Sequence, residues 1–135
     1  MNISATIKTI PHMKHRYATL GDYVWKISKS SVVFKIFASR ELGIDSAFLV
    51  LLHEFVEMIL CIKHGVTDGI ITEWDVSHPD ENDPGAIRGC PYYFEHMTAL
   101  KVEKCVADAM GVDWPSHNRK LKHVFYRFQP PIKLM

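Results

Sequence analysis

The stretch LLHEFVEMILCIKHG, residues 51–65, is an apolar run of helical length that holds one histidine and two glutamates near its start. Its aliphatic and aromatic residues require burial, and they draw His53, Glu54 and Glu57 toward the interior with them. A buried carboxylate is costly unless it is protonated, paired with a cation or bound to a metal ion. The sequence therefore raises the question of what stabilises these three side chains.

This run belongs to the best-supported helix of the chain. Asp45 or Ser46 can cap its N-terminus, and Gly65 can end it. A shorter helix is predicted within residues 67–77, and a second long helix is predicted over residues 92–110. The polar and apolar spacing of both long segments favours helices that pack against each other.

The N-terminal third of the chain carries strand signals. Residues 2–10 alternate in part, with Ile3, Ala5 and Ile7 on one side. Residues 21–28 and 31–39 are two β-rich runs separated by two residues, a spacing that indicates a hairpin. With the helices, these strands predict an α+β fold in which a small antiparallel N-terminal sheet of about three strands packs on two long helices.

Length and composition indicate one globular domain. The chain has 135 residues, of which 47% are hydrophobic and 23% charged, with a formal net charge of +1. We assign residues 1–114 to a single α+β domain and residues 115–135 to a C-terminal extension. The sequence contains no apolar run of membrane-spanning length and no signal-peptide pattern, so a cytoplasmic protein without a membrane partner is expected.

Charge is concentrated at the C-terminal end. Residues 1–113 contain 11 Lys and Arg against 15 Asp and Glu, whereas residues 114–135 contain five basic residues and no acidic one. Phe125, Tyr126 and Phe128 are interleaved with these bases. Such a segment can bind nucleic acid or an acidic partner. The alternative, which we favour, is a solvated extension whose aromatic pair docks on the core.

The three cysteines do not form a recognisable framework. Cys61, Cys90 and Cys105 lack CxxC spacing, and an odd number argues against paired disulfides. Cys61 and Cys105 lie in apolar helical pattern and are expected to be packed free thiols. Cys90 is expected in a loop before the second long helix.

The polar groups of the first helix have the spacing of a metal site. His53 and Glu57 are four residues apart, so both point to one face of a helix, one turn apart. Glu54 is rotated about 100° from His53, the position that a general base occupies beside the metal in an HExxH helix. Here the second histidine is replaced by Glu57, which gives HExxE. Zinc and other divalent ions accept this carboxylate ligand.

The second long helix offers a third ligand. His96 and Glu103 are seven residues apart and share a face. We expect His96 to complete the metal site and Glu103 to hold an imidazole from outside it. Asp75 is either a further ligand, a supporting acid or a helix cap. Glu95 is expected to point into solvent.

Other interpretations of the same residues remain open. A helix can bury a His–Glu pair through ordinary hydrogen bonds without a metal ion. A di-iron site requires two ExxH motifs, which the sequence lacks. His64 is expected to lie too far along the first helix to share the metal. The other histidines are expected at the surface: His12, His15, His78, His117 and His123.

Several short motifs occur together in an order that resembles a known group of proteins. RYATLGDY, LLHEFVEMILC, TEWD, YYFEHMTALKVE and GVDW, spread over residues 16–114, are similar to the pattern of a family of small bacteriophage and prophage proteins with a HELVE-type helix. The resemblance implies a phage or prophage origin and supports the same site residues. The HELVE helix in turn resembles the active-site helix of zincin metallopeptidases, although zincins usually carry HExxH.

The sequence thus predicts a zincin-like hydrolase that depends on zinc or another divalent metal ion. One form of such a hydrolase is a peptidase that acts on a peptide or protein. His53, Glu57 and His96 are the predicted ligands, and Glu54 is the predicted catalytic base. The alternative is a non-enzymatic phage accessory protein that acts through its surface, with a structural metal site or a buried His–Glu cluster.

Overall fold

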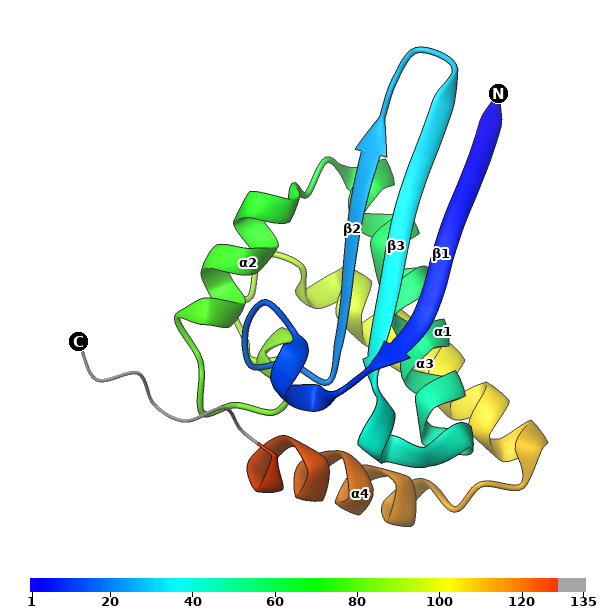
Figure 1. The fold of residues 1–135 in the computed structure, drawn as a ribbon. Coiled ribbons are helices and arrows are strands. Elements are labelled where there is room, and N and C mark those ends of the chain that lie inside the picture. Colours follow the sequence, from blue (N-terminus) through cyan, green and yellow to red (C-terminus); the bar gives the residue numbers. More distant parts are fainter. Residues whose placement is uncertain (129–135) are drawn as a thin grey trace.

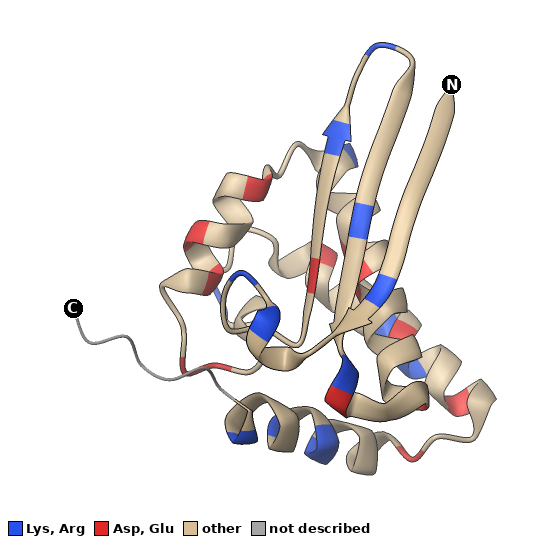
Figure 2. Ribbon diagram, viewed as in Figure 1, with Lys and Arg blue, Asp and Glu red and all other residues tan. Residues whose placement is uncertain are grey.

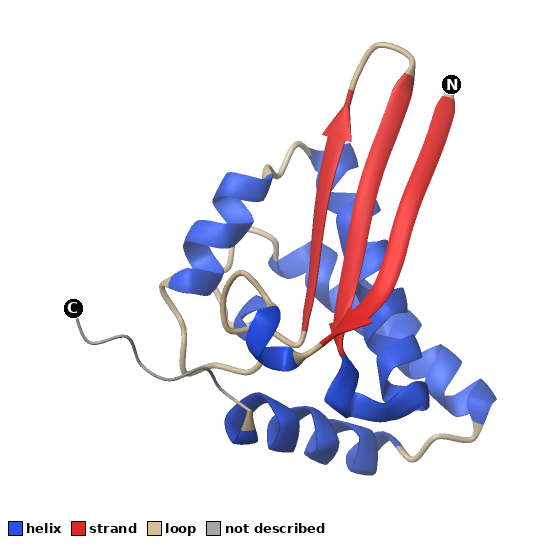
Figure 3. Ribbon diagram, in the orientation of Figure 1, coloured by secondary structure: helices blue, strands red, loops and turns tan. Residues whose placement is uncertain are grey.

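Three strands and four α-helices make up residues 1–128, the part of the chain that the computed structural model describes. They are β1 (Asn2–Ile10), β2 (Gly21–Ile27), β3 (Ser31–Ser39), α1 (Gly43–His64), α2 (Asp68–Val76), α3 (Tyr93–Met110) and α4 (Trp114–Arg127). The predicted α+β class is confirmed. In Figure 3 the sheet forms one layer, and the long helices form a second layer behind it.

The sheet is mixed. The predicted hairpin is present, because β2 and β3 pair antiparallel from Gly21–Ala38 to Ile27–Val32. β1 instead pairs in parallel with β3, which places β3 in the centre of the order β1-β3-β2. The prediction of a purely antiparallel sheet is therefore wrong for β1. Strand periodicity and hairpin spacing do not encode which strand is central. Here β3, the second strand of the hairpin, lies between β1 and β2.

Helix α1 packs on the inner face of the sheet. Phe34 and Ile36 of β3 form a core cluster with Met58 and Cys61 of α1. The helix ends where the sequence predicts, because Gly65 adopts a left-handed conformation with φ of 74° and its N–H bonds back to the last turn. Figure 1 shows α3 beside α1, behind the sheet, with α2 next to β2.

Helix α4 closes the lower end of the molecule in Figure 1. Asp113 caps it by accepting a hydrogen bond from the Ser116 N–H. Val124 and Phe125 are only 2% and 1% exposed and belong to a second core cluster. The segment that the sequence analysis treats as an extension thus contributes a helix to the core. Residues 129–135, the end of that segment, lie outside the described residues.

The basic side chains of α4 lie away from this core. Figure 2 shows Lys and Arg distributed along the helix, and the four of them are exposed: Arg119, Lys120, Lys122 and Arg127. Of the expected aromatic pair, Phe125 is buried, whereas Tyr126 remains 54% exposed. A nucleic-acid or acidic partner for this surface stays a prediction.

The cysteines are free, as expected, but they are not all packed. Cys61 and Cys90 are buried, whereas Cys105 is exposed on α3, so the prediction of burial is wrong for Cys105. Its position falls on the solvent side of a helix that is only partly covered. Among residues 1–128, none of the helices combines the length and apolarity needed to cross a lipid bilayer.

Candidate metal centre

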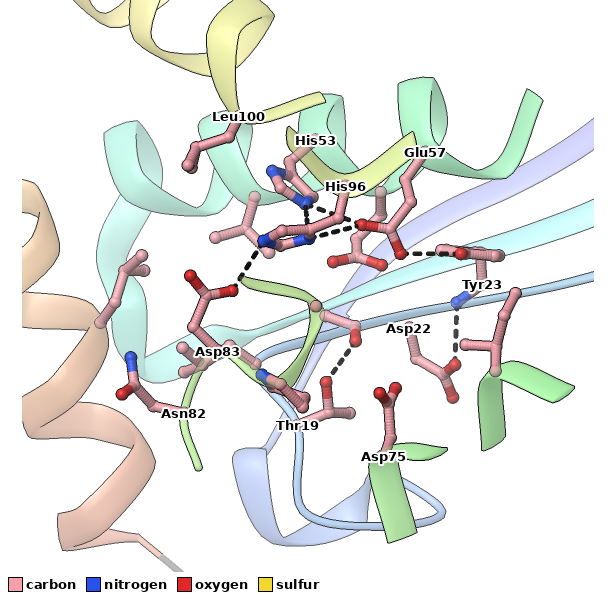
Figure 4. Close-up of a pocket in the computed structure, with 18 of the residues that line it drawn as sticks. Thr19, Asp22, Tyr23, His53, Glu57, Asp75, Asn82, Asp83, His96 and Leu100 are labelled. Atoms are coloured by element: carbon pink, nitrogen blue, oxygen red, sulfur yellow. Dashed lines mark hydrogen bonds and ion pairs between the residues drawn. The ribbon is translucent and has the colours of Figure 1, made fainter. Parts of the chain in front are cut away.

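The predicted ligands of the two long helices come together. His53 and Glu57 lie one turn apart on α1, and His96 faces them from α3. His53 Nε2 is 3.0 Å from Glu57 Oε2 and 3.1 Å from His96 Nδ1, and His96 Nδ1 is 2.8 Å from Glu57 Oε2. All three side chains are buried. Figure 4 shows these three atoms converging on one point between the helices.

In each candidate ligand, the second polar atom, which faces away from the cluster, contacts a further residue. His53 Nδ1 lies 2.8 Å from Glu103 Oε1. The hydroxyl of Tyr23 on β2 donates a hydrogen bond of 2.8 Å to Glu57 Oε1. Such outer contacts fix ring orientation and leave the inward atoms available as ligands, which is the usual design of a protein metal site.

His96 is held from the loop between α2 and α3. Its Nε2 atom lies 2.8 Å from Asp83 Oδ1, at the distance of an ion pair. Both imidazoles therefore have a carboxylate on the side that faces away from the cluster. Because Asp83 is partly exposed, this contact is the more loosely held of the two.

Glu103 connects the cluster to α4. Its Oε2 atom is 2.6 Å from His117 Nε2, and His117 Nδ1 is 2.9 Å from Ser46 Oγ on α1. His117 and Glu103 are 2% and 3% exposed, so this chain of contacts is shielded from water. It ties three helices together directly behind His53.

The charges around the cluster favour a cation at the three ligand atoms that face one another. Burial acts to lower the pKa of His53, but hydrogen bonds to Glu103 and Glu57 outweigh it and hold the pKa well above the ordinary value. Burial likewise opposes the raised pKa of His96, about 9, to which Asp83 and Glu57 contribute. The pKa of Glu57 falls to about 2, because the two imidazoles outweigh the effect of burial.

The residues fit a divalent metal ion. Two imidazole nitrogens and one carboxylate oxygen within 3.1 Å of one another can all bind an ion at about 2.0–2.2 Å. The raised pKa values of His53 and His96 favour protons on the two imidazoles in the metal-free chain, and one divalent cation can replace two such protons without changing the net charge of the cluster. The buried group His53, Glu57 and His96 is thus positioned to bind a metal.

A cavity of about 100 Å³ opens beside this cluster. Its lining includes Glu54, Asp75 and Asn82 in addition to the three candidate ligands. Glu54 is half-buried in the wall, and within residues 1–128 its carboxylate has no hydrogen-bond partner. Burial, followed by the charge of Glu57, holds its pKa well above the usual range. A carboxylate with a raised pKa in this position suits the role of a proton acceptor and donor.

Two glycines make room for this arrangement. A Cβ atom at Gly21 would lie 2.7–2.8 Å from the side chain of Glu54. A Cβ atom at Gly85 would lie 2.5 Å from Cγ and 2.6 Å from Nδ1 of His96. Both contacts are too close for any larger residue, so the backbone itself forms part of the wall behind the base and behind one ligand.

Asp75 lines the cavity without reaching the cluster. It accepts hydrogen bonds from the hydroxyls of Tyr17, at 2.9 Å, and Tyr92. It therefore supports the cavity wall between α2 and the loop that precedes β2. Neither tyrosine is a candidate ligand, so the three predicted roles of Asp75, ligand, supporting acid and helix cap, stay predictions.

Other predictions about polar residues are corrected. Glu95 is 6% exposed and accepts a hydrogen bond from His64, so its expected exposure is wrong. His12 and His117 are each 2% exposed and are not surface histidines. Tyr23, Asp83 and His117 were missed as supporting residues. No local pattern identifies them, because the partners Glu57, His96 and Glu103 lie 34, 13 and 14 residues away along the chain.

No protein-family model, no curated protein and no solved structure matches this chain. The resemblance to phage and prophage proteins, and the zincin-like interpretation, therefore stay predictions.

Proposed function

We propose that this chain is a metal-dependent hydrolase in which His53, Glu57 and His96 hold a zinc ion and Glu54 is the general base. The observation that carries the proposal is the convergence of three buried ligand atoms whose outer atoms are all held, next to a carboxylate in the cavity wall. Two histidines and one glutamate form the donor set of several catalytic zinc sites.

Each residue has a defined task in such a reaction. A divalent ion at this position would supply Lewis-acid chemistry, polarising a carbonyl group and lowering the pKa of a water molecule. Glu54 would accept a proton from a water molecule in the cavity and would return it to the leaving group. Glu103 and Tyr23 keep His53 and Glu57 oriented, so that the inward atoms stay fixed during the reaction.

An amide bond in a peptide is the proposed substrate. The order of β3 followed by a helix that carries HExxE resembles the layout of zincin metallopeptidases and supports this choice. A cavity of about 100 Å³ accommodates only a small group beside the cluster, so most of a peptide would lie along the surface.

The test combines metal analysis with turnover. Purified wild type, His53→Ala, His96→Ala and Glu54→Gln are compared by elemental mass spectrometry and by cleavage of a fluorogenic peptide library. His64→Ala is the matched control, because His64 lies on the same helix but bonds to Glu95 instead of the cluster. We expect one equivalent of zinc in wild type, His64→Ala and Glu54→Gln, loss of zinc in the other two, and turnover only in wild type and His64→Ala.

The competing function is a non-enzymatic protein with a structural cluster, for which the complete burial of the ligands is the specific observation. It predicts that Glu54→Gln behaves like wild type in every assay and that His53→Ala lowers the melting temperature sharply. Wild type without metal, and insensitive to a chelator, would refute the metal site. Wild type with zinc and no cleavage of any library peptide would refute the peptidase proposal alone.

A further inference from the structure

The apolar side of β1 is left uncovered. In the parallel register Ala5 lies beside Phe34 and Ile7 beside Ile36, so these residues point to the inner side of the sheet. Phe34 and Ile36 are 7% and 0% exposed beneath α1. Ile3 and Ile7, on the same side of β1, are 69% and 55% exposed. The alternation in β1 thus gives the strand an apolar side that no other part of residues 1–128 covers.

Helix α1 continues this uncovered face. Phe48, Phe55 and Ile59 lie on its outer side, and they are 56%, 37% and 44% exposed. The ring of Phe55 lies 5.7 Å from that of Phe34, the neighbour of Ala5 across the ladder. The strand and helix surfaces therefore adjoin each other. We call the surface formed by Ile3, Ile7, Phe48, Phe55 and Ile59 the β1–α1 face.

The β1–α1 face is as large as the largest apolar patch of a typical monomer. With about 200 Å² for a fully exposed large apolar side chain, its five residues expose roughly 500 Å². The largest apolar patch on a typical monomer is about 300–600 Å² and is often functional. The neighbouring backbone of β1 adds polar surface that a partner strand can pair with. The apolar face and this backbone surface together approach the roughly 800 Å² that each partner buries in a standard interface.

The edge of the sheet lacks the usual protection. β1 is an outer strand, as Figure 1 shows, and its ladder with β3 runs without a bulge from Asn2 to Ile10. Lys8 is its only charged residue. Natural proteins usually block such an edge with several charges, a proline or a bulge, because free N–H and C=O groups otherwise recruit another strand.

We propose that the β1–α1 face is a homodimer interface in which β1 pairs antiparallel with β1 of a second copy. A twofold axis perpendicular to the sheet reverses the strand direction and keeps both inner faces on the same side. The two sheets then form one six-stranded sheet, and the apolar sides of both α1 helices face each other above it. A second copy fits because the exposed strand is complementary to itself in both hydrogen bonding and apolar pattern.

The interface leaves the candidate metal centre accessible. His53 and Glu57 project from the opposite side of α1, toward α3 and the cavity. The proposal therefore stands whether or not the chain is a hydrolase. In the dimer, each of the two cavities lies away from the twofold axis.

Solution mass tests the dimer. Sedimentation equilibrium is measured on the full chain from about 1 to 100 µM, a range that detects micromolar association. We expect wild type to have twice the 15.5 kDa chain mass. Ile7→Glu should weaken dimerisation at least about 100-fold, because symmetry buries two unpaired carboxylates. Val33→Glu is the control, since Val33 is 46% exposed on the other side of the sheet, and it should remain dimeric.

Hydrogen exchange of wild type gives a second test that needs no variant. Alternate N–H groups of β1 point away from β3, and they exchange rapidly in a monomer but are protected in the dimer. The proposal would be overturned if wild type is a monomer at about 100 µM and the N–H groups along β1 exchange rapidly. A dimer that Ile7→Glu and Val33→Glu leave equally intact would also overturn it, since the interface would then lie elsewhere.

Discussion

Substitution of Gly85 by alanine should separate the metal ligand role of His96 from simple packing. The added Cβ would lie 2.5 Å from Cγ and 2.6 Å from Nδ1 of the His96 ring, where ordinary contact begins at 3.4 Å. The φ angle of Gly85 is not positive, so alanine adds no backbone strain there. The ring must therefore move by close to 1 Å, away from its place beside His53 and Glu57.

A shift of that size exceeds what coordination tolerates. Metal–ligand distances vary by about 0.2 Å in good sites, so His96 Nδ1 would no longer bind in its present position. We expect the Kd for zinc to rise by about 100-fold or more, the upper range for changes that disturb ligand orientation. Overpacking should also lower the free energy of unfolding of the metal-free protein by about 1–3 kcal/mol.

The assay is competition for zinc against a chromophoric chelator, with thermal melts of the metal-free proteins. Gly69→Ala is the control, because its Cβ would meet nothing closer than 3.9 Å and its φ is also not positive. This variant should bind zinc as wild type does. If Gly85→Ala binds zinc with unchanged affinity although it melts at a lower temperature, His96 is not a ligand in the described geometry.

Three further variants probe the supports of the site and the core. Glu103→Gln should weaken zinc binding by about 10–100-fold without loss of the fold, because the carboxylate no longer orients His53; chelator competition measures it. Burial raises the pKa of Asp75 to about 6, against hydrogen bonds from Tyr92 and Tyr17 that lower it. The folded state therefore binds this proton more tightly than the unfolded state. The resulting stability is complete below the ordinary value of 3.8 and is lost as pH rises through about 6. Asp75→Asn should thus raise stability by on the order of 2 kcal/mol above pH 7 and change it little near pH 4, as followed by melts across pH. An equal effect at both pH values would contradict this assignment. Phe125→Ala should lower the free energy of unfolding by about 3–5 kcal/mol, as measured by chemical denaturation, because the ring is only 1% exposed. Tyr126→Ala should lower it far less, because Tyr126 is 54% exposed.

The core of the candidate centre could be predicted from local geometry. His53 and Glu57 face the same way on any helix, because residues four apart are neighbours on its surface. Glu54 follows from the same geometry, and His96 follows from the need for a third ligand on a second apolar helix. These residues were found because helical periodicity is a property of short segments, which the sequence displays directly.

The supporting contacts could not be predicted in this way. His53 reaches Glu103 across 50 positions, and Ser46 reaches His117 across 71. Such pairs depend on how α3 and α4 pack against α1. His117 looks like a surface histidine in the sequence, because a polar residue on a basic helix gives no sign that its own face is buried.

The sequence by itself determined the strands, the end of the first long helix at Gly65 and the face on which that helix carries its polar residues, because each depends on interactions within a few residues. It did not indicate α4, which lies in the segment assigned to an extension, nor the start of α1 at Gly43, before the predicted caps Asp45 and Ser46. Only the tertiary structure decided that β3 is central and parallel to β1, that Asp83 and Tyr23 hold the candidate ligands, and that the apolar side of β1 stays exposed. Those features depend on the order in which distant elements pack, and one chain satisfies its local preferences equally well in several such orders.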